Sequence, residues 1–227
     1  SLMNTENKPH WLPIAPWVFL VVWSAGYGVA KLALESTTPM NLLALRFVGA
    51  LLALVPFMLL LRPVWPSSNA VKDLLVVASF LQLGHFFCIY LGLSLGASAG
   101  LLALLAASQP VLVTIVASLL NRRIPSARIW VGLLVGLVGA VWVIFIQGDF
   151  SDGVLLGAIL GFFAVVSLSL GQVYDKRQCP DCHPLLVYII QYAFASIVCV
   201  PVALLFEGYQ TEWNSSLIGA LSYLVLG

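Results

Sequence analysis

The chain has 227 residues, of which 61% are apolar and only 8% are charged, and its formal net charge is +1. An average soluble domain is about 45–50% apolar and about 25% charged, so this chain is too apolar to cover a water-facing surface. The composition excludes a soluble enzyme, a disordered chain and a disulfide-stabilised secreted domain. The small net charge also argues against nucleic acid as a partner, since no basic stripe is present to neutralise phosphates.

Turn-forming and charged residues divide the chain into eight apolar segments. A membrane span needs about 20 apolar residues and must be helical, because lipid offers the backbone no hydrogen-bond partner. The predicted helices cover residues 14–33, 39–61, 73–94, 98–120, 127–146, 154–174, 184–206 and 216–227. The first is too long for the apolar core of a signal peptide, which predicts that it remains as a span. The last is too short to cross a core of about 30 Å, so we expect the sequence to stop within a helix.

Lysine and arginine collect in alternate loops. With the N-terminus inside, the inner loops hold eight of the ten cations: Lys8, Arg62, Lys72, Arg122, Arg123, Arg128, Lys176 and Arg177. The outer loops hold acids instead: Glu35, Asp149, Asp152, Glu207 and Glu212. Because cytoplasmic loops carry an excess of Lys and Arg, the pattern predicts a cytoplasmic N-terminus.

The second and seventh predicted helices match each other at an offset of 145 residues. Pro39 aligns with Pro184 and Pro56 with Pro201, so two prolines stand 17 residues apart in both copies. Matches of Leu, Val or Ala would mean little in so apolar a chain, whereas paired prolines are informative. The alignment therefore predicts an internal repeat.

The repeat unit contains five helices, an odd number, so its second copy must cross the membrane in the opposite sense. We predict an all-α polytopic membrane protein with two inverted five-helix repeats, residues 1–146 and a truncated copy at 153–227, within a protein of ten helices. Arg46 aligns with Gln191 in this repeat. Transporters built from inverted repeats have a substrate site near the membrane midplane between the halves.

Several short motifs occur together in these helices. The first two helices contain Trp23-Ser24, Lys31, Pro39 and Leu45-Arg46-Phe47. The third to fifth contain Tyr90–Ser94, Ala97–Gly100, Gln109-Pro110-Val111 and Gly132 with Gly139. Over about residues 14–206 the pattern resembles the EamA-type transporters of the drug/metabolite transporter superfamily, which implies a ten-helix exporter of metabolites or drugs. One departure is Arg122-Arg123, where the family usually has Glu-Arg after its fourth helix.

Glycines four residues apart form three small-residue faces. They are Gly92, Gly96 and Gly100; Gly132 and Gly136; and Gly153, Gly157 and Gly161. Such faces let helix backbones approach closely in a membrane. We favour close packing within the bundle, with a homodimer through one of these faces as the alternative.

Six side chains are predicted to line one substrate site near the membrane midplane. They are Trp23, Tyr27, Gln82, His85, Ser108 and Gln109. Polar groups at this depth cost free energy unless they have a partner or face a cavity. The alternative is that Gln109 and His85 hydrogen-bond across helices and serve only structure.

His85 is the one group near the midplane that titrates close to neutral pH, because no Asp or Glu lies in the middle of a predicted helix. Gln82 is three residues away and shares its helix face, so we expect it to hydrogen-bond a neutral His85 ring. Two roles stay open for His85: binding substrate, which we favour, or carrying a coupled proton. Pro110 has no N–H, so the fourth helix should bend there and leave the Ala106 carbonyl free.

Two cations lie within the predicted helices. Lys31 is near the outer end of its helix and can extend to the interface. Arg46 lies about seven residues inside its helix, where an unpaired guanidinium is costly, and Glu35 is the acid nearest to it in sequence. We favour structural pairing or carbonyl capping by Arg46, with recognition of an anionic or carboxylate-bearing substrate as the alternative.

The run Cys179-Pro-Asp-Cys182-His183 matches the C-x-x-C-H pattern of haem c attachment. Lys176 and Arg177 place it in an inner loop, whereas haem c is attached outside the cytoplasm. Weak metal binding is a second alternative, and an ordinary reduced loop is the interpretation we favour.

These patterns predict a secondary transporter, an exporter of a small organic metabolite or drug by alternating access, in the plasma membrane of a bacterium. We expect the lipid bilayer and a small-molecule substrate as its partners, with no catalytic residue, metal or cofactor. The alternative is an integral membrane enzyme that acts on a lipid or prenyl substrate. Such an enzyme needs paired carboxylates or a histidine-based metal site, and the three histidines at 10, 85 and 183 are far apart in sequence.

Overall fold

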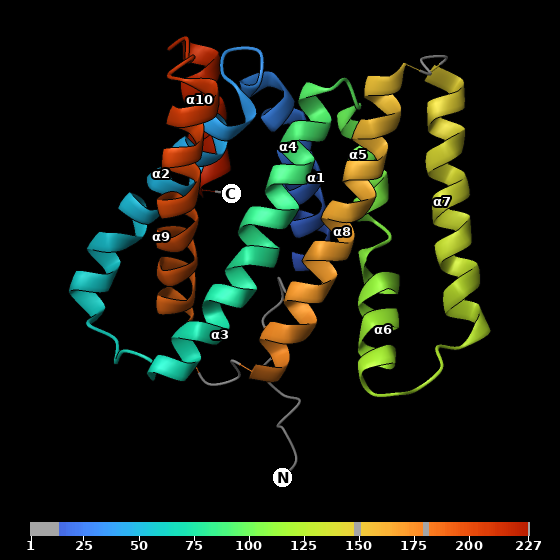
Figure 1. The fold of residues 1–227 in the computed structure, drawn as a ribbon, viewed down its shortest axis with the longest axis horizontal. Coiled ribbons are helices and arrows are strands. Elements are labelled where there is room, and N and C mark those ends of the chain that lie inside the picture. Colours follow the sequence, from blue (N-terminus) through green and yellow to red (C-terminus); the bar gives the residue numbers. More distant parts are fainter. Residues whose placement is uncertain (1–13, 148–150, 179–181, 227) are drawn as a thin grey trace.

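The computed structural model describes residues 14–147, 151–178 and 182–226. In this part of the chain all regular secondary structure is helical (Figure 1), apart from one isolated antiparallel bridge between Thr37 and Thr211. The segments are α1 (Ala15–Ala33), α2 (Pro39–Leu61), α3 (Ser68–Ala78), η2 (Ser79–His85), α4 (Phe86–Ser94), α5 (Ala99–Ala106), α6 (Gln109–Leu120), α7 (Ala127–Gln147), α8 (Asp152–Gln178), α9 (Pro184–Val202), η3 (Ala203–Glu207) and α10 (Ser215–Leu226). Lys8, Asp149 and Cys179 lie outside the described residues.

Three groups of these segments each form one span. The segments α3, η2 and α4 run on as a helix over Ser68–Ser94, α5 and α6 cover Ala99–Leu120, and α9 with η3 covers Pro184–Glu207. Together with α2, α7 and α8 they make six described helices that are long and apolar enough to cross a membrane. This confirms the prediction of an all-α polytopic membrane protein.

The predicted helix boundaries are close to the observed ones, with one clear difference. The third span begins at Ser68 instead of residue 73, because the Ser67 side chain accepts a hydrogen bond from the Ala70 N–H and caps the helix. The expected bend before Pro110 is confirmed, since the fourth span is interrupted at Ala107 and Ser108. His183 of the C-x-x-C-H run also caps a helix, by accepting a hydrogen bond from the Leu185 N–H.

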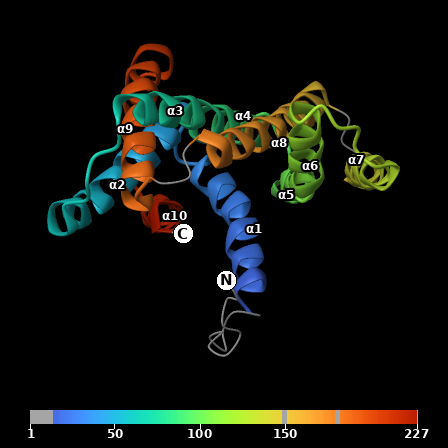
Figure 2. The same ribbon diagram turned by 90° about the horizontal axis from the view of Figure 1, so that it is seen from below.

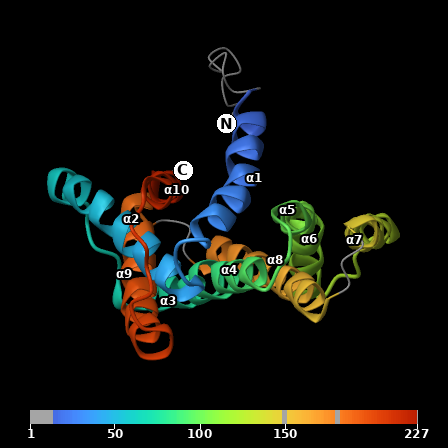
Figure 3. The ribbon, with the colours of Figure 1, turned by 90° about the horizontal axis from the view of Figure 1, so that it is seen from above.

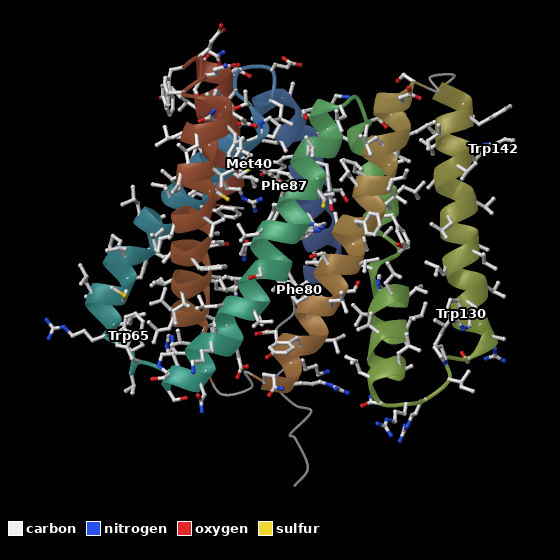
Figure 4. The ribbon with its side chains drawn as sticks, viewed as in Figure 1. Met40, Trp65, Phe80, Phe87, Trp130 and Trp142 are labelled. Carbon is white, nitrogen blue, oxygen red and sulfur yellow. The ribbon has the colours of Figure 1, made fainter. Side chains whose placement is uncertain are left out.

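Helix α8 is the centre of the bundle. It packs against α3, η2, α4, α5 and α6, while α2 packs along α9 and α1 against α10. Figures 2 and 3 show α7 at one edge of the molecule and α2 with α9 toward the other. Helix α7 packs on α5 and α6, and its apolar side chains are largely exposed. Trp130 and Trp142 lie near its opposite ends (Figure 4), which is where interfacial tryptophans are found in membrane proteins.

Glycines allow α4 and α8 to touch backbone to backbone. A Cβ added at Gly157 would lie 2.8 Å from the Gly92 carbonyl oxygen and 2.8 Å from the Ala97 Cβ. A Cβ at Gly153 would collide with the Leu95 carbonyl oxygen, and one at Gly161 would lie 2.5 Å from a Leu102 methyl. The predicted close packing is confirmed for Gly92, Gly153, Gly157 and Gly161, whereas a Cβ added at Gly132 or Gly136 would meet only ordinary contacts at 3.7–3.8 Å and one at Gly100 would meet none.

Replacing Gly157 with alanine should therefore destabilise the protein. The new methyl group meets a backbone oxygen that cannot move alone, and overpacking of this kind costs about 1–3 kcal/mol. We expect a lower unfolding temperature for Gly157→Ala in detergent. Gly100→Ala is the matched control, because no atom lies within 4 Å of a Cβ added at Gly100. Equal unfolding temperatures for the two variants would contradict the assigned role of Gly157.

Candidate functional site

A cavity of about 70 Å³ lies between α1, α2, α4 and α10, with the last residue of η2 at its wall. Ligand pockets are typically about 300–1,000 Å³, so in this conformation the cavity holds only a small group. Its walls are mostly apolar and aromatic. The lining residues are Val22, Trp23, Gly26, Tyr27, Ala30, Arg46, His85, Phe86, Ile89, Tyr90, Tyr223 and Leu224.

His85 is fixed at this wall by a contact with α8. Its side chain is 1% exposed, and Nδ1 lies 3.0 Å from the Ala164 carbonyl oxygen. A carbonyl can only accept, so Nδ1 carries the hydrogen, and Nε2 of the neutral ring is left as an acceptor. The imidazole meets the Phe86 ring edge-on at 4.9 Å and stacks on Trp23 at 6.4 Å between ring centroids.

Arg46 reaches the same cavity from α2. Its Nε donates to the Leu224 carbonyl oxygen at 3.2 Å, and Nη1 donates to the Tyr90 hydroxyl at 3.0 Å. The guanidinium carbon lies 3.7 Å from the centroid of the Phe86 ring, in a cation–π contact. Capping of a carbonyl by Arg46 is confirmed, but Glu35 is not its partner. Glu35 is exposed, and among the described residues Arg46 contacts no carboxylate.

The six predicted site residues do not line one cavity. Trp23, Tyr27 and His85 do, whereas Gln82, Ser108 and Gln109 are not part of its wall. The Tyr27 side chain is buried, and its hydroxyl lies beside the Trp23 indole without a hydrogen bond of good geometry.

Gln82 faces α9 instead of His85. Its Nε2 donates to Gln191 Oε1 at 2.9 Å, and its own Oε1 has no partner among the described residues. The expected hydrogen bond with His85 is therefore wrong. Residues 79–85 form a π-helix, whose wider turn separates residues three apart that would share a face of an α-helix.

Ser108 and Gln109 lie at the interruption between α5 and α6. The Ser108 hydroxyl donates to the Leu105 carbonyl at 2.6 Å, and a Cβ added at Gly136 of α7 would lie 3.8 Å from Ser108 Cβ. Gln109 is half-buried. The prediction that Ser108 and Gln109 line the site is based on their depth in the membrane. Depth does not determine which neighbouring helix a side chain faces.

Sequence reasoning missed Phe86, Tyr90 and Tyr223 as cavity residues. Phe86 and Tyr90 are four residues apart at the start of α4 and share one face of that helix. Because Phe86 follows His85 and Tyr90 lies one helical turn further on, the sequence contained a usable signal that both line the same cavity as His85. Tyr223 gave no such signal; its hydroxyl donates to the Val22 carbonyl and joins α10 to α1.

A mostly apolar cavity with several aromatic rings and a few fixed polar groups, within a bundle of membrane helices, is typical of a membrane protein that binds a small solute. Residues 14–145 match the EamA-like transporter family, and the chain belongs to that family. It is a multi-pass protein of the bacterial inner membrane, as its apolar helices and its similarity to inner membrane transporters show.

Two curated relatives are transporters whose function is uncharacterized. The inner membrane transporter YedA of Escherichia coli K12 is 26% identical over 167 residues, which cover 72% of this chain and 52% of YedA. The transporter YdfC of Bacillus subtilis 168 is 25% identical over 233 residues, which cover 98% of this chain and 71% of YdfC. The aligned region thus spans about half the length of YedA. No solved structure matches the chain.

Replacing His85 should separate its possible roles. His85→Gln should weaken the apparent affinity for a transported solute about tenfold, the worth of roughly one buried hydrogen bond. If His85 binds substrate, the dependence of uptake on the pH gradient should stay unchanged; loss of that dependence with downhill flux intact would mean that His85 carries the coupled proton. The control is His183→Asn, since asparagine can also cap α9. Wild-type uptake by His85→Ala at all pH values would leave His85 with a structural role only.

Proposed function

We propose that the full-length protein is a secondary transporter that exports a small organic metabolite or drug by alternating access. The observation that carries the proposal is the cavity, which is lined by α1, α2 and α4 of the first predicted repeat and by α10 of the second. A site shared between two halves is reached from either side when the halves move against each other. Membership of the EamA-like transporter family supports the proposal.

The packing of the helices supports two inverted repeats. The second span packs on the seventh (α2 on α9), the third on the sixth (α4 on α8), and the first on the eighth (α1 on α10). A two-fold axis that relates the repeats exchanges the first predicted helix with the sixth, the second with the seventh and the third with the eighth. The same axis relates the contact between the third and sixth helices to the contact between the eighth and first. It maps the contact between the second and seventh helices onto itself. The repeat proposed from the two pairs of prolines therefore agrees with the contacts.

The distribution of charge along the bundle supports a cytoplasmic N-terminus. The ends of α2, α6 and α8 and the starts of α3 and α7 lie together at the lower end in Figure 1, and the loops there carry Arg62, Arg122 and Arg123. The opposite end carries acids, Glu207 and Glu212 among them. In a bacterial inner membrane the positive end faces the cytoplasm.

Residues 36–41 and 207–214 bind each other at the acidic end and form what we term the outer latch. The Glu207 carboxylate accepts from the Thr38 hydroxyl, from the Met40 N–H at 3.0 Å and from the Asn41 N–H at 3.2 Å. A carboxylate at the start of α2 also interacts favourably with the helix dipole. The Asn41 side chain donates to the Gly208 carbonyl at 2.8 Å. These contacts join the two predicted repeats, so the latch supports a closed outer side.

A reconstituted protein should move a solute unchanged across vesicle membranes, and filling the cavity should stop it. Gly26 lines the cavity with no atom within 4 Å of an added Cβ, so Gly26→Leu places a side chain in the cavity without a clash at Cβ. In vesicles loaded with a panel of labelled metabolites, we expect this variant to reduce efflux about tenfold or more. Gly28→Leu is the matched control on α1, since its Cβ is equally free and Gly28 is not in the cavity wall.

Two results would oppose the transporter proposal. Equal efflux by the Gly26 and Gly28 variants would mean that solute does not pass through this cavity. Chemical conversion of a lipid or prenyl compound, without solute flux, would favour the alternative of a membrane enzyme. In the described residues, no group of three or more His, Cys, Asp or Glu side chains is placed to hold a metal ion.

Weakening the outer latch should expose the α1–α2 loop to the outside. Glu207→Gln keeps the shape of the side chain and removes its charge, and charge-assisted hydrogen bonds contribute about 1.5–3 kcal/mol. With Thr37→Cys as a buried reporter and the native cysteines replaced, we expect an impermeant thiol reagent added outside to react about tenfold faster in the Glu207→Gln protein.

Two controls accompany the latch experiment. Glu212→Gln removes an acid from the same loop, and only the Glu212 backbone N–H contacts the α1–α2 loop, so the labelling rate should not change. Arg123→Cys should stay unlabelled from outside. Labelling at 123 would reverse the proposed orientation, and equal rates for the two glutamate variants would contradict the latch.

A further inference from the structure

The cavity contains a positive charge that nothing in the described residues neutralises. The positively charged guanidinium of Arg46 has a backbone carbonyl, a phenol hydroxyl and an aromatic ring as its partners. None of these carries a negative charge. No Asp or Glu of the described residues lines the cavity. A guanidinium at membrane depth is costly without a counter-charge, so an anion that entered the cavity would bind favourably.

The bonds that Arg46 makes leave part of its guanidinium available. A guanidinium has five N–H donors, and the two hydrogen bonds use the Nε–H and one N–H of Nη1. Those bonds, with the Phe86 ring at 3.7 Å, also hold the group in one orientation. A fixed guanidinium with free N–H groups has the geometry that a carboxylate accepts in a bidentate pair.

The remainder of the cavity suits the apolar body of such a ligand. Apolar and aromatic side chains from α1, α4 and α10 form most of the wall, and its aromatic rings include Trp23, Tyr27 and Tyr223. The buried Tyr27 hydroxyl, which has no hydrogen-bond partner among the described residues, is a donor that a carboxylate can also use. One cation matches the single charge of a monocarboxylate, whereas a phosphate carries about two charges at neutral pH.

We propose that the substrate is a small monocarboxylate with an apolar body, and that Arg46 binds its carboxylate. This proposal rests on the proposed transport function. The same side chain caps the Leu224 carbonyl of α10, so the bound anion and the second predicted repeat share one guanidinium. Neutral amides of equal shape bind weakly because they leave the charge uncompensated. Amines are repelled.

The test compares ligands that differ only in charge. The full-length protein in detergent is titrated with benzoate and isobutyrate, with their neutral amides, and with benzylamine and isobutylamine, and binding is followed by tryptophan fluorescence and by thermal stabilisation. We expect each carboxylate to bind at least about tenfold more tightly than its amide, and the amines not to bind. Arg46→Gln should abolish the difference between acid and amide, and Lys72→Gln, which removes an exposed cation, should preserve it.

Arg46→Lys keeps the test decisive if Arg46→Gln does not fold. Lysine retains the charge without the planar fork, so the preference for carboxylates should persist at reduced affinity. Equal binding of acids and amides by the wild type, or an unchanged preference in a folded Arg46→Gln protein, would overturn the proposal and leave Arg46 as a structural cap.

The binding test and the transport test fail separately. Carboxylate binding that depends on Arg46, without solute flux in vesicles, would support the anion site and contradict the proposed transport function. Flux of neutral or cationic solutes, without preferential binding of carboxylates, would support the proposed transport function and contradict the proposal of a monocarboxylate substrate.

Discussion

The arrangement of this bundle depends on the close approach of α8 to the helix formed by α3, η2 and α4. Apolar side chains gain little from leaving lipid for another apolar surface, so helices in a membrane associate through tight packing and interhelical hydrogen bonds. Helix α8 has both. Its glycines meet Gly92 and Leu95 at one end, and a Cβ added at Gly171 would lie 2.9 Å from Leu81 and Phe80 near the other. Between them, the Ser167 hydroxyl donates to the Phe80 carbonyl at 2.8 Å.

This contact also decides where the polar side chains of η2 point. The π-helix at Ser79–His85 lies against α8, where Gly84 leaves room for the Ser167 side chain and His85 bonds to Ala164. His85 thereby reaches the cavity, and Gln82 turns to Gln191 on α9. Arg46 and Gln191 align in the proposed repeat, yet one brings a charge to the cavity and the other pairs with an amide. If the proposed repeat is correct, the two halves pack in the same way, but equivalent positions carry different side chains with different roles.

The sequence predicted how deep each side chain lies in the membrane but not which neighbouring helix it faces. Hydropathy, prolines and charged loops predicted the eight helices, because the thickness of lipid fixes the length of a span. They could not tell that Ser108 packs beside Gly136 or that Gln82 turns away from His85, since these helices are apolar all round and lack a stripe that marks the inner face. The π-helix has no sequence signature of its own. Arg46 was recognisable as a costly side chain, and the carbonyl capping favoured for it is observed at Leu224, but Glu35, the acid nearest in sequence, is exposed to solvent and is not its partner.

The location of Glu207 has an energetic consequence for any movement of the outer side. Separating its carboxylate from the start of α2 exposes a charge and two backbone N–H groups together. At the level of the acyl chains this would cost many kcal/mol, since nothing there replaces the lost partners. At the end of the bundle water can solvate both groups at once, so separation costs only the net worth of the bonds, about 1.5–3 kcal/mol for each hydrogen bond to the charged group. The polar bonds at the membrane surface can therefore be exchanged for bonds to water, whereas the glycine contacts between α4 and α8 are packing contacts that water does not replace.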